Sequence, residues 1–207
     1  MALKALRIGA GAGYAGDRIP PAVALAEKGQ LDYLVFECLA ERTIALAQLE
    51  KIQNPMRGFD PLLSARMKAV LPACMAHGTR IITNMGAANP LQAGKEVLAV
   101  AKALGLHQLK VAVVLGDDVL AILQTQYLSE PLMDSTHTVS DIQALLVSAN
   151  AYLGAEALLP ALQSDAHVII SGRVADPALF LAPLMHHFQW RADDWPLLGK
   201  GVMVGHL

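Results

Sequence analysis

Charge and cysteine are both scarce in this chain of 207 residues. Only 16% of the residues are Asp, Glu, Lys or Arg, the formal net charge is -2, and no block rich in Lys or Arg occurs. Nucleic-acid binding depends on such basic blocks, so the sequence argues against a nucleic-acid partner. The two cysteines, Cys38 and Cys74, are far apart and form no CxxC pair. We expect both to be reduced, buried and apolar in behaviour.

Long apolar runs and a cleavable leader are also missing. The most apolar stretch, 142–155, contains Ser148 and Asn150 and is shorter than the roughly 18 residues that a membrane span needs. The first residues are followed by Gly and Ala rather than by the apolar core of a signal peptide. We therefore expect a cytoplasmic protein with no membrane partner.

What the chain does have is a repeated pattern. Six short apolar runs, rich in β-branched residues, each end in a cluster of polar residues or glycine and lead into a stretch with helical spacing. The expected strands are 6–9, 33–36, 80–83, 110–115, 144–149 and 167–171. Near-continuous apolar strands that alternate with helices are typical of a parallel sheet covered on both faces. We predict one α/β domain over 1–207, with a mostly parallel, doubly wound sheet of about six strands.

The fold class also predicts where a site lies. Ligands of such sheets bind just beyond the carboxyl ends of the strands. The polar clusters that end the runs should therefore converge on one edge of the sheet, although the sequence separates them by more than a hundred residues.

The high apolar content needs an explanation of its own. Hydrophobic residues make up 54% of the chain, and a solitary domain generally has more charge on its surface. Either the chain forms homo-oligomers through an apolar face, or it is the front part of a longer polypeptide. The abrupt end at 205–207, without a polar tail, favours the second explanation.

A glycine pattern after the first expected strand suggests a nucleotide site. The GxGxxG pattern is formed by Gly11, Gly13 and Gly16. Glu37 ends the next strand at the spacing of a dinucleotide-binding fingerprint. That site needs a helix that begins inside the glycine run, and Pro20 and Pro21 would break it. We therefore expect a loop over 14–19, which argues against NAD and leaves a flexible loop without a ligand as the alternative.

Carboxylates are the first candidates for chemistry. Asp117 and Asp118 follow the fourth run and could bind Mg²⁺ or act as acid–base groups, and Glu37 could share the acid–base role. The alternative is that Asp118 caps a helix and Asp117 is a solvated loop residue. No HExxH, GxSxG or Walker pattern occurs, so zinc, nucleophile-elbow and P-loop sites are not predicted.

Amide and guanidinium side chains are the second set of candidates for chemistry. Asn84 and Asn150 have no capping role and are candidates to orient a carbonyl, whereas Asn89 precedes Pro90 and fits a helix cap. Arg18 and Arg173 could each bind a carboxylate or phosphate. Each also lies near an aspartate, Asp17 and Asp176 respectively, with which it could simply pair to fix a loop.

Taken in order along the chain, these clusters point to a family. The segments concerned are 16–18, 32–34, 41–43, 83–86, 89–90, 116–118, 148–155 and 171–176. Together they resemble the amino-terminal domain of the acyclic terpene utilisation protein A family, whose members are considerably longer. We expect a ligand to contact residues in these segments, namely Gly16, Asp17, Arg18, Gly86, Asn89, Gly116, Tyr152, Gly172, Arg173 and Asp176.

The resemblance implies a role in breaking down citronellol-like or geraniol-like terpenes through acyl-CoA intermediates. One hypothesis is an enzyme that acts on a branched acyl-CoA or a related carboxylate by hydration or carbon–carbon lyase chemistry. It would use Glu37, Asp117, Asn84 and Asn150 as catalytic groups. The other hypothesis is a non-catalytic subunit that binds an acyl ligand or a partner enzyme.

Overall fold

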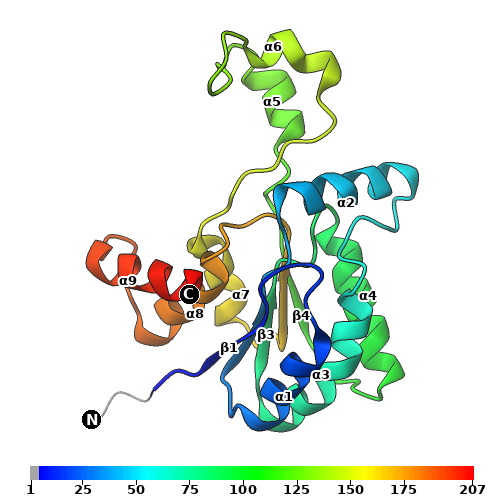
Figure 1. Ribbon diagram of the computed structural model, residues 1–207, viewed down its shortest axis with the longest axis vertical. Helices are drawn as coiled ribbons and strands as arrows, with labels where there is room; N and C mark the ends of the chain where they lie inside the picture. The colour runs from blue at the N-terminus through cyan, green and yellow to red at the C-terminus, as the bar shows by residue number, and fades with distance from the viewer. Residues whose placement is uncertain (1–4) are drawn as a thin grey trace.

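The computed structural model describes residues 5–207, and in these residues one five-stranded sheet is formed with every strand parallel to its neighbours. The strand order is β1-β2-β3-β5-β4. The strands are β1 (Ile8–Ala12), β2 (Tyr33–Phe36), β3 (Arg80–Thr83), β4 (Val111–Val114) and β5 (Val168–Ser171). The predicted α/β class with a doubly wound parallel sheet is confirmed (Figure 1).

The strands are apolar on both sides because both faces of the sheet are covered. All four residues of β2 are buried. Leu34 and Phe36 contribute to the hydrophobic core on one face, and Tyr33 and Val35 contribute to the core on the other. A strand that is buried on both faces needs this continuous apolar pattern, which is why it was detectable in the sequence.

Helices form a layer on each face of the sheet (Figure 1). On one face lie α1 (Ile19–Lys28), α3 (Leu63–His77) and α4 (Pro90–Ala103). On the other lie η2 (Ala155–Leu158), α7 (Leu159–Gln163) and α8 (Ala178–Phe188), with α9 (Trp195–His206) packed on α8. No helix within residues 5–207 is long and apolar enough to cross a membrane.

The connections after β3 and β5 part in opposite directions. The chain after β3 enters α4 on one face, whereas the chain after β5 enters α8 on the opposite face. Because β3 and β5 are neighbours, a topological switch point lies between their carboxyl ends. Ligands of open α/β sheets bind at such a point. The helix α2 (Glu41–Gln53) lies above this end of the sheet (Figure 1).

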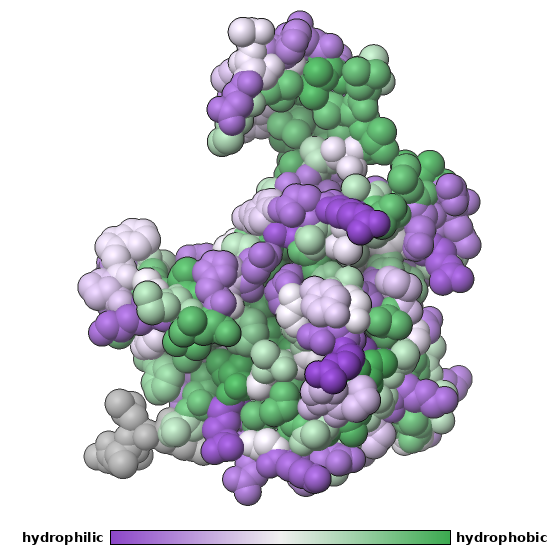
Figure 2. Space-filling model, viewed as in Figure 1, coloured by the Kyte–Doolittle hydropathy of each residue, from purple (hydrophilic) through white to green (hydrophobic). Residues whose placement is uncertain are grey.

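Residues 118–150, here called the arm, project away from the sheet beyond α2 (Figure 1). The arm contains α5 (Leu120–Gln126), α6 (Val139–Ile142) and η1 (Gln143–Leu145). Only Val139 of the arm is buried. Figure 2 shows hydrophobic residues gathered on one side of the arm. No Lys or Arg occurs between Lys110 and Arg173, so the basic side chain available to its acidic residues is His137, which lies 4.0 Å from Asp141.

The fifth of the six predicted strands, 144–149, is wrong. This segment forms the end of η1 and an extended return to the sheet, with only an isolated bridge between Asn150 and Asp118. Leu145 and Val147 are 78% and 56% exposed. The apolar run therefore belongs to the surface of the arm, and not to the buried strand that its composition suggested.

Candidate functional site

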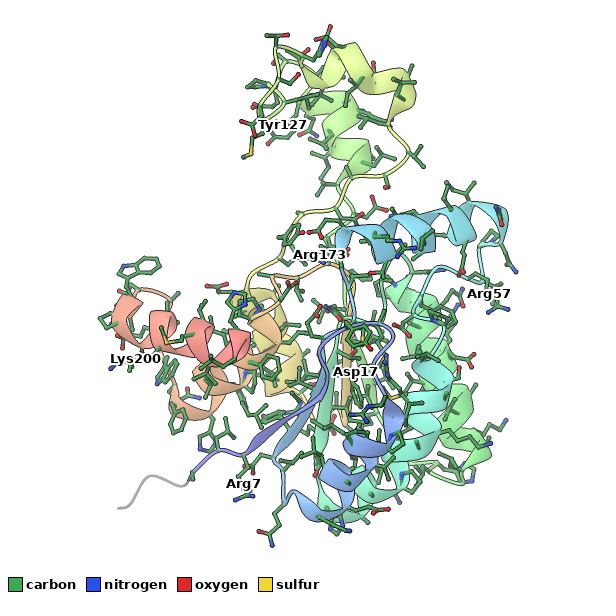
Figure 3. The ribbon with its side chains drawn as sticks, in the orientation of Figure 1. Arg7, Asp17, Arg57, Tyr127, Arg173 and Lys200 are labelled. Atoms are coloured by element: carbon green, nitrogen blue, oxygen red, sulfur yellow. The ribbon has the colours of Figure 1, made fainter. Side chains whose placement is uncertain are left out.

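The loops after β2, β3, β4 and β5 meet at the carboxyl end of the sheet, as predicted. Figure 3 shows Arg173, from the loop after β5, between α2 and the base of the arm. Its backbone N–H donates to Asp117 from the loop after β4, and its guanidinium donates to the carbonyl of Leu39 from the loop after β2. The side chain of Asn84, after β3, donates to Glu37. Residues far apart in sequence therefore form one connected group.

Asp117 is the centre of the first half of this group. It is 4% exposed, and its Oδ2 accepts hydrogen bonds from the N–H of Arg173 at 2.8 Å and from the amide of Asn150 at 2.9 Å. The amide of Gln48, on α2, donates to Asn150 Oδ1 at 3.3 Å. A Cβ on Gly172 would lie 2.4 Å from Asp117 Oδ2, so only glycine allows this approach. Asp117 is thus a buried, bonded carboxylate and not a solvated loop residue.

Arg173 pairs with Asp176, which is the structural alternative that the sequence left open. The guanidinium is 3% exposed and donates to Asp176 Oδ1 at 2.9 Å. Its Cζ lies 3.8 Å from the centre of the Tyr152 ring, and the Tyr152 hydroxyl donates to Glu41. The Arg173 Nε has no hydrogen-bond partner. Arg173 therefore ties the base of the arm to the loop before α2.

Glu37 and Asn84 form the second half of the group. Glu37 Oε1 accepts hydrogen bonds from Asn84 Nδ2 at 2.8 Å and from the Leu39 N–H at 3.0 Å. Asn84 is fully buried, and its Oδ1 accepts a hydrogen bond from the Cys38 N–H at 2.8 Å. Burial raises the pKa of Glu37 above its ordinary value, against the opposing effect of these hydrogen bonds. Asn84 therefore positions Glu37 and the chain after β2.

A third cluster, behind the first two, was not predicted from the sequence. Arg66, on α3, is fully buried, and its NH1 lies 3.0 Å from Cys38 Sγ and 3.7 Å from Asp60 Oδ2. Its NH2 donates to the carbonyls of Ala15 and Asp17. The signal in the sequence is that Arg66 lies among the buried apolar positions of its helix, where an arginine needs buried partners.

The loop after β1 adopts the predicted course. Helix α1 begins at Ile19, after the glycine run, as the prolines required. Asp17 closes the loop, because its carboxylate accepts hydrogen bonds from the N–H groups of Gly13 and Arg18, and these bonds lower its pKa. Gly16 and Arg18 are exposed. Gly11 of the fingerprint pattern packs against the Phe36 ring, so packing explains why a glycine stands at this position.

Asn89 is at the predicted helix start but does not cap the helix with its side chain. Its amide instead donates to the carbonyls of Pro55 and Arg57, at 2.9 and 2.7 Å, and holds the turn between α2 and α3. Gly86 lies at the crossing of two loops, because a Cβ there would be 2.4 Å from the Ser171 carbonyl. Both residues therefore shape the end of β3.

Several cavities border the connected group. One has a volume of about 240 Å³ and contains five predicted residues, namely Asn89, Gly116, Asp117, Asp118 and Asn150. Another, here called the α2 cavity, has a volume of about 160 Å³ and is lined by Asn84, Cys38, Asp60 and mainly apolar residues of α2 and its neighbours. A third, of about 220 Å³, is lined by Asn150, Tyr152 and Arg173, so the predicted residues are divided among three hollows.

Asp118 lies apart from the buried group. It is exposed, and its Oδ1 accepts a hydrogen bond from the Leu120 N–H at 3.3 Å, near the position expected for a cap. Within residues 5–207, no three His, Cys, Asp or Glu side chains gather as a set that could hold a metal ion. Mg²⁺ binding at Asp117 and Asp118 stays a prediction. Both cysteines are buried and free, as predicted.

Comparison of the chain with known proteins identifies its family. No curated protein and no solved structure matches the chain. A family model, described as acyclic terpene utilisation family protein AtuA, matches residues 6–207. That range contains every segment on which the resemblance depended, including the loops at the carboxyl end of the sheet. The chain therefore belongs to the acyclic terpene utilisation family AtuA.

Proposed function

We propose that this protein is an enzyme of acyclic terpene utilisation that acts on a branched acyl-CoA or a related carboxylate. The observation that supports this most directly is Glu37. Its carboxyl group is half-buried at the carboxyl end of β2, its Oε1 is fixed by two donors, and its pKa is raised. A positioned carboxyl group with a raised pKa is suited to general acid–base catalysis near neutral pH.

Hydration or carbon–carbon lyase chemistry fits these groups. In hydration, Glu37 takes a proton from the water that adds to the β-carbon of an unsaturated acyl group, and it returns a proton to the α-carbon. Arg18 is the better placed of the two arginines for an anionic substrate group. Its side chain is exposed, whereas the Arg173 guanidinium is buried and bonded to Leu39 and Asp176.

The test is the variant Glu37→Gln, which keeps the shape and the acceptor oxygen but removes the ionisable group. We expect turnover of a methyl-branched, unsaturated acyl-CoA, followed by mass spectrometry, to fall about 10²- to 10⁴-fold. Glu27→Gln, at the end of α1, is the matched control and should keep full turnover. Full activity of Glu37→Gln would contradict the proposal.

The second candidate is a non-catalytic subunit, and the exposed apolar residues of the arm favour it. A thermal-shift screen with coenzyme A thioesters, MgCl₂ and nicotinamide dinucleotides separates the candidates, because a ligand that binds the native state raises Tm. The enzyme proposal expects a shift with thioesters. A shift with none of the three supports the non-catalytic candidate, and a shift with dinucleotides alone supports a nucleotide site.

A further inference from the structure

The α2 cavity is a hollow that the acid–base group does not use. Its wall is made mainly of the apolar side chains of Leu39, Leu46, Ala47, Phe59, Met85 and Ala87. Leu46 is 50% exposed, and it marks the side on which the cavity opens to solvent. Below the cavity lie the buried Asn84 and Cys38.

We propose that the α2 cavity binds the aliphatic end of an acyl ligand, with the polar end of that ligand outside. The inference rests on the proposed function, since it names where the chain of the same substrate lies. Asn84 joins the two sites, because it lines the cavity and also donates to Glu37. An aliphatic chain in the cavity therefore lies only one side chain away from the acid–base group.

Charge decides which end of the ligand enters. Asp60 lines the cavity, is 6% exposed, and would repel a carboxylate or a phosphate. Behind the wall, the NH1 and NH2 groups of the buried cation Arg66 already contact Cys38, Asp60 and the carbonyls of Ala15 and Asp17, and its unpaired Nε is buried. An anionic group would have to displace these partners, whereas an alkyl group needs none of them. The apolar end is thus the end that the cavity accepts.

The volume of the α2 cavity limits the length of the aliphatic end that it can hold. The cavity measures about 160 Å³. An apolar protein cavity of about 150 Å³ takes up benzene, so we expect room for about six carbons. A methyl-branched chain of this size fills the hollow, and a longer chain extends into solvent on the open side. The cavity would therefore select for the terminal part of a ligand and not for its whole length.

The test is isothermal titration calorimetry of the full chain with straight-chain carboxylic acids from butanoic to dodecanoic acid, and with citronellic acid as a branched probe. Each methylene that enters the cavity should tighten binding about fourfold, until about six carbons are buried. The primary alcohols should show the same dependence on chain length, because the polar end stays outside. Affinity that does not depend on chain length would overturn the proposal.

Two variants locate the binding. Ala47→Phe fills the cavity from α2 and should weaken octanoic acid binding at least about tenfold, because several methylenes are excluded. Ala99→Phe, on the exposed side of α4, makes the same substitution away from the cavity and should bind as the parent chain does. A thermal melt of each variant shows that it is folded. Unchanged binding by a folded Ala47→Phe would refute the assignment.

The variant Glu37→Gln separates this inference from the proposed function. It should bind octanoic acid with unchanged affinity, because Glu37 does not line the cavity. If Glu37→Gln also keeps full turnover, the acid–base proposal fails while the chain pocket stands. If turnover is lost but no acid binds the parent chain, the pocket fails while the acid–base proposal stands.

Discussion

At the scale of single residues, burial sets the behaviour of Glu37. Desolvation raises its pKa above the ordinary value of 4.5, so the folded protein binds this proton more tightly than the unfolded chain does. The stability that Glu37 contributes is then fully present below pH 4.5 and is lost as the pH rises through the folded-state pKa. This pH dependence of stability is opposite to that of a carboxylate in a stabilising ion pair, which loses its contribution as the pH falls.

We therefore expect the difference in unfolding free energy between the parent chain and Glu37→Gln to change with pH. Relative to the variant, the parent chain should lose stability as the pH rises above 4.5, because only the parent has to ionise this desolvated group. Urea unfolding at a series of pH values measures this difference. A difference that grows in favour of the parent as the pH rises would mean that the pKa is lowered instead.

The residues of the site show what a sequence can and cannot predict. Asp117, Asn84 and Arg173 were expected to meet because each follows a strand of a parallel sheet, and the shared direction of the strands brings them together. Arg66 could not be predicted in the same way. Its role depends on carbonyls of the loop after β1, which approach it only in the folded chain.

At the scale of elements, Pro72 is an unusual residue in α3. It lies inside a 15-residue helix, where proline removes one backbone hydrogen bond and crowds the preceding turn. The helix nevertheless continues through this position to His77. Because Pro72 is exposed, no packing interaction compensates for the lost bond.

We expect Pro72→Ala to raise the unfolding free energy by about 1 kcal/mol, since alanine restores the bond and favours the helix. Thermal and urea unfolding measure the change. The matched control is Pro20→Ala in the first turn of α1, where proline is tolerated and its loss should be neutral or destabilising by about 0.5 kcal/mol. A destabilised Pro72→Ala would show that the proline ring makes a contact that α3 needs.

The arm shows why element type is harder to predict than element position. An apolar run over 144–149 has the composition of a buried strand, and only tertiary structure decides whether a sheet edge is available to it. In this fold β5 is flanked by β3 and β4, so the run has no place beside it. It forms the end of η1 and an exposed return to the sheet instead.

At the scale of the whole molecule, self-association stays a prediction, and the arm is where we expect it. The arm exposes Met133 and Leu145 at 90% and 78%, which is unusual for large apolar side chains. Light scattering coupled to gel filtration should show a dimer or larger species for the parent chain. Leu145→Lys should shift this species toward the monomer, whereas Leu98→Lys on α4 should not. A monomeric parent chain would contradict the prediction.

The distribution of basic residues has a practical consequence for anyone who probes the arm. Trypsin cuts after Lys and Arg, and it therefore has no cleavage site from 111 to 172, although the arm is the most projecting part of the molecule. Digestion of the native protein with this enzyme would spare the segment that looks most vulnerable. A protease that cuts after Leu, Met or Tyr should open the chain there first.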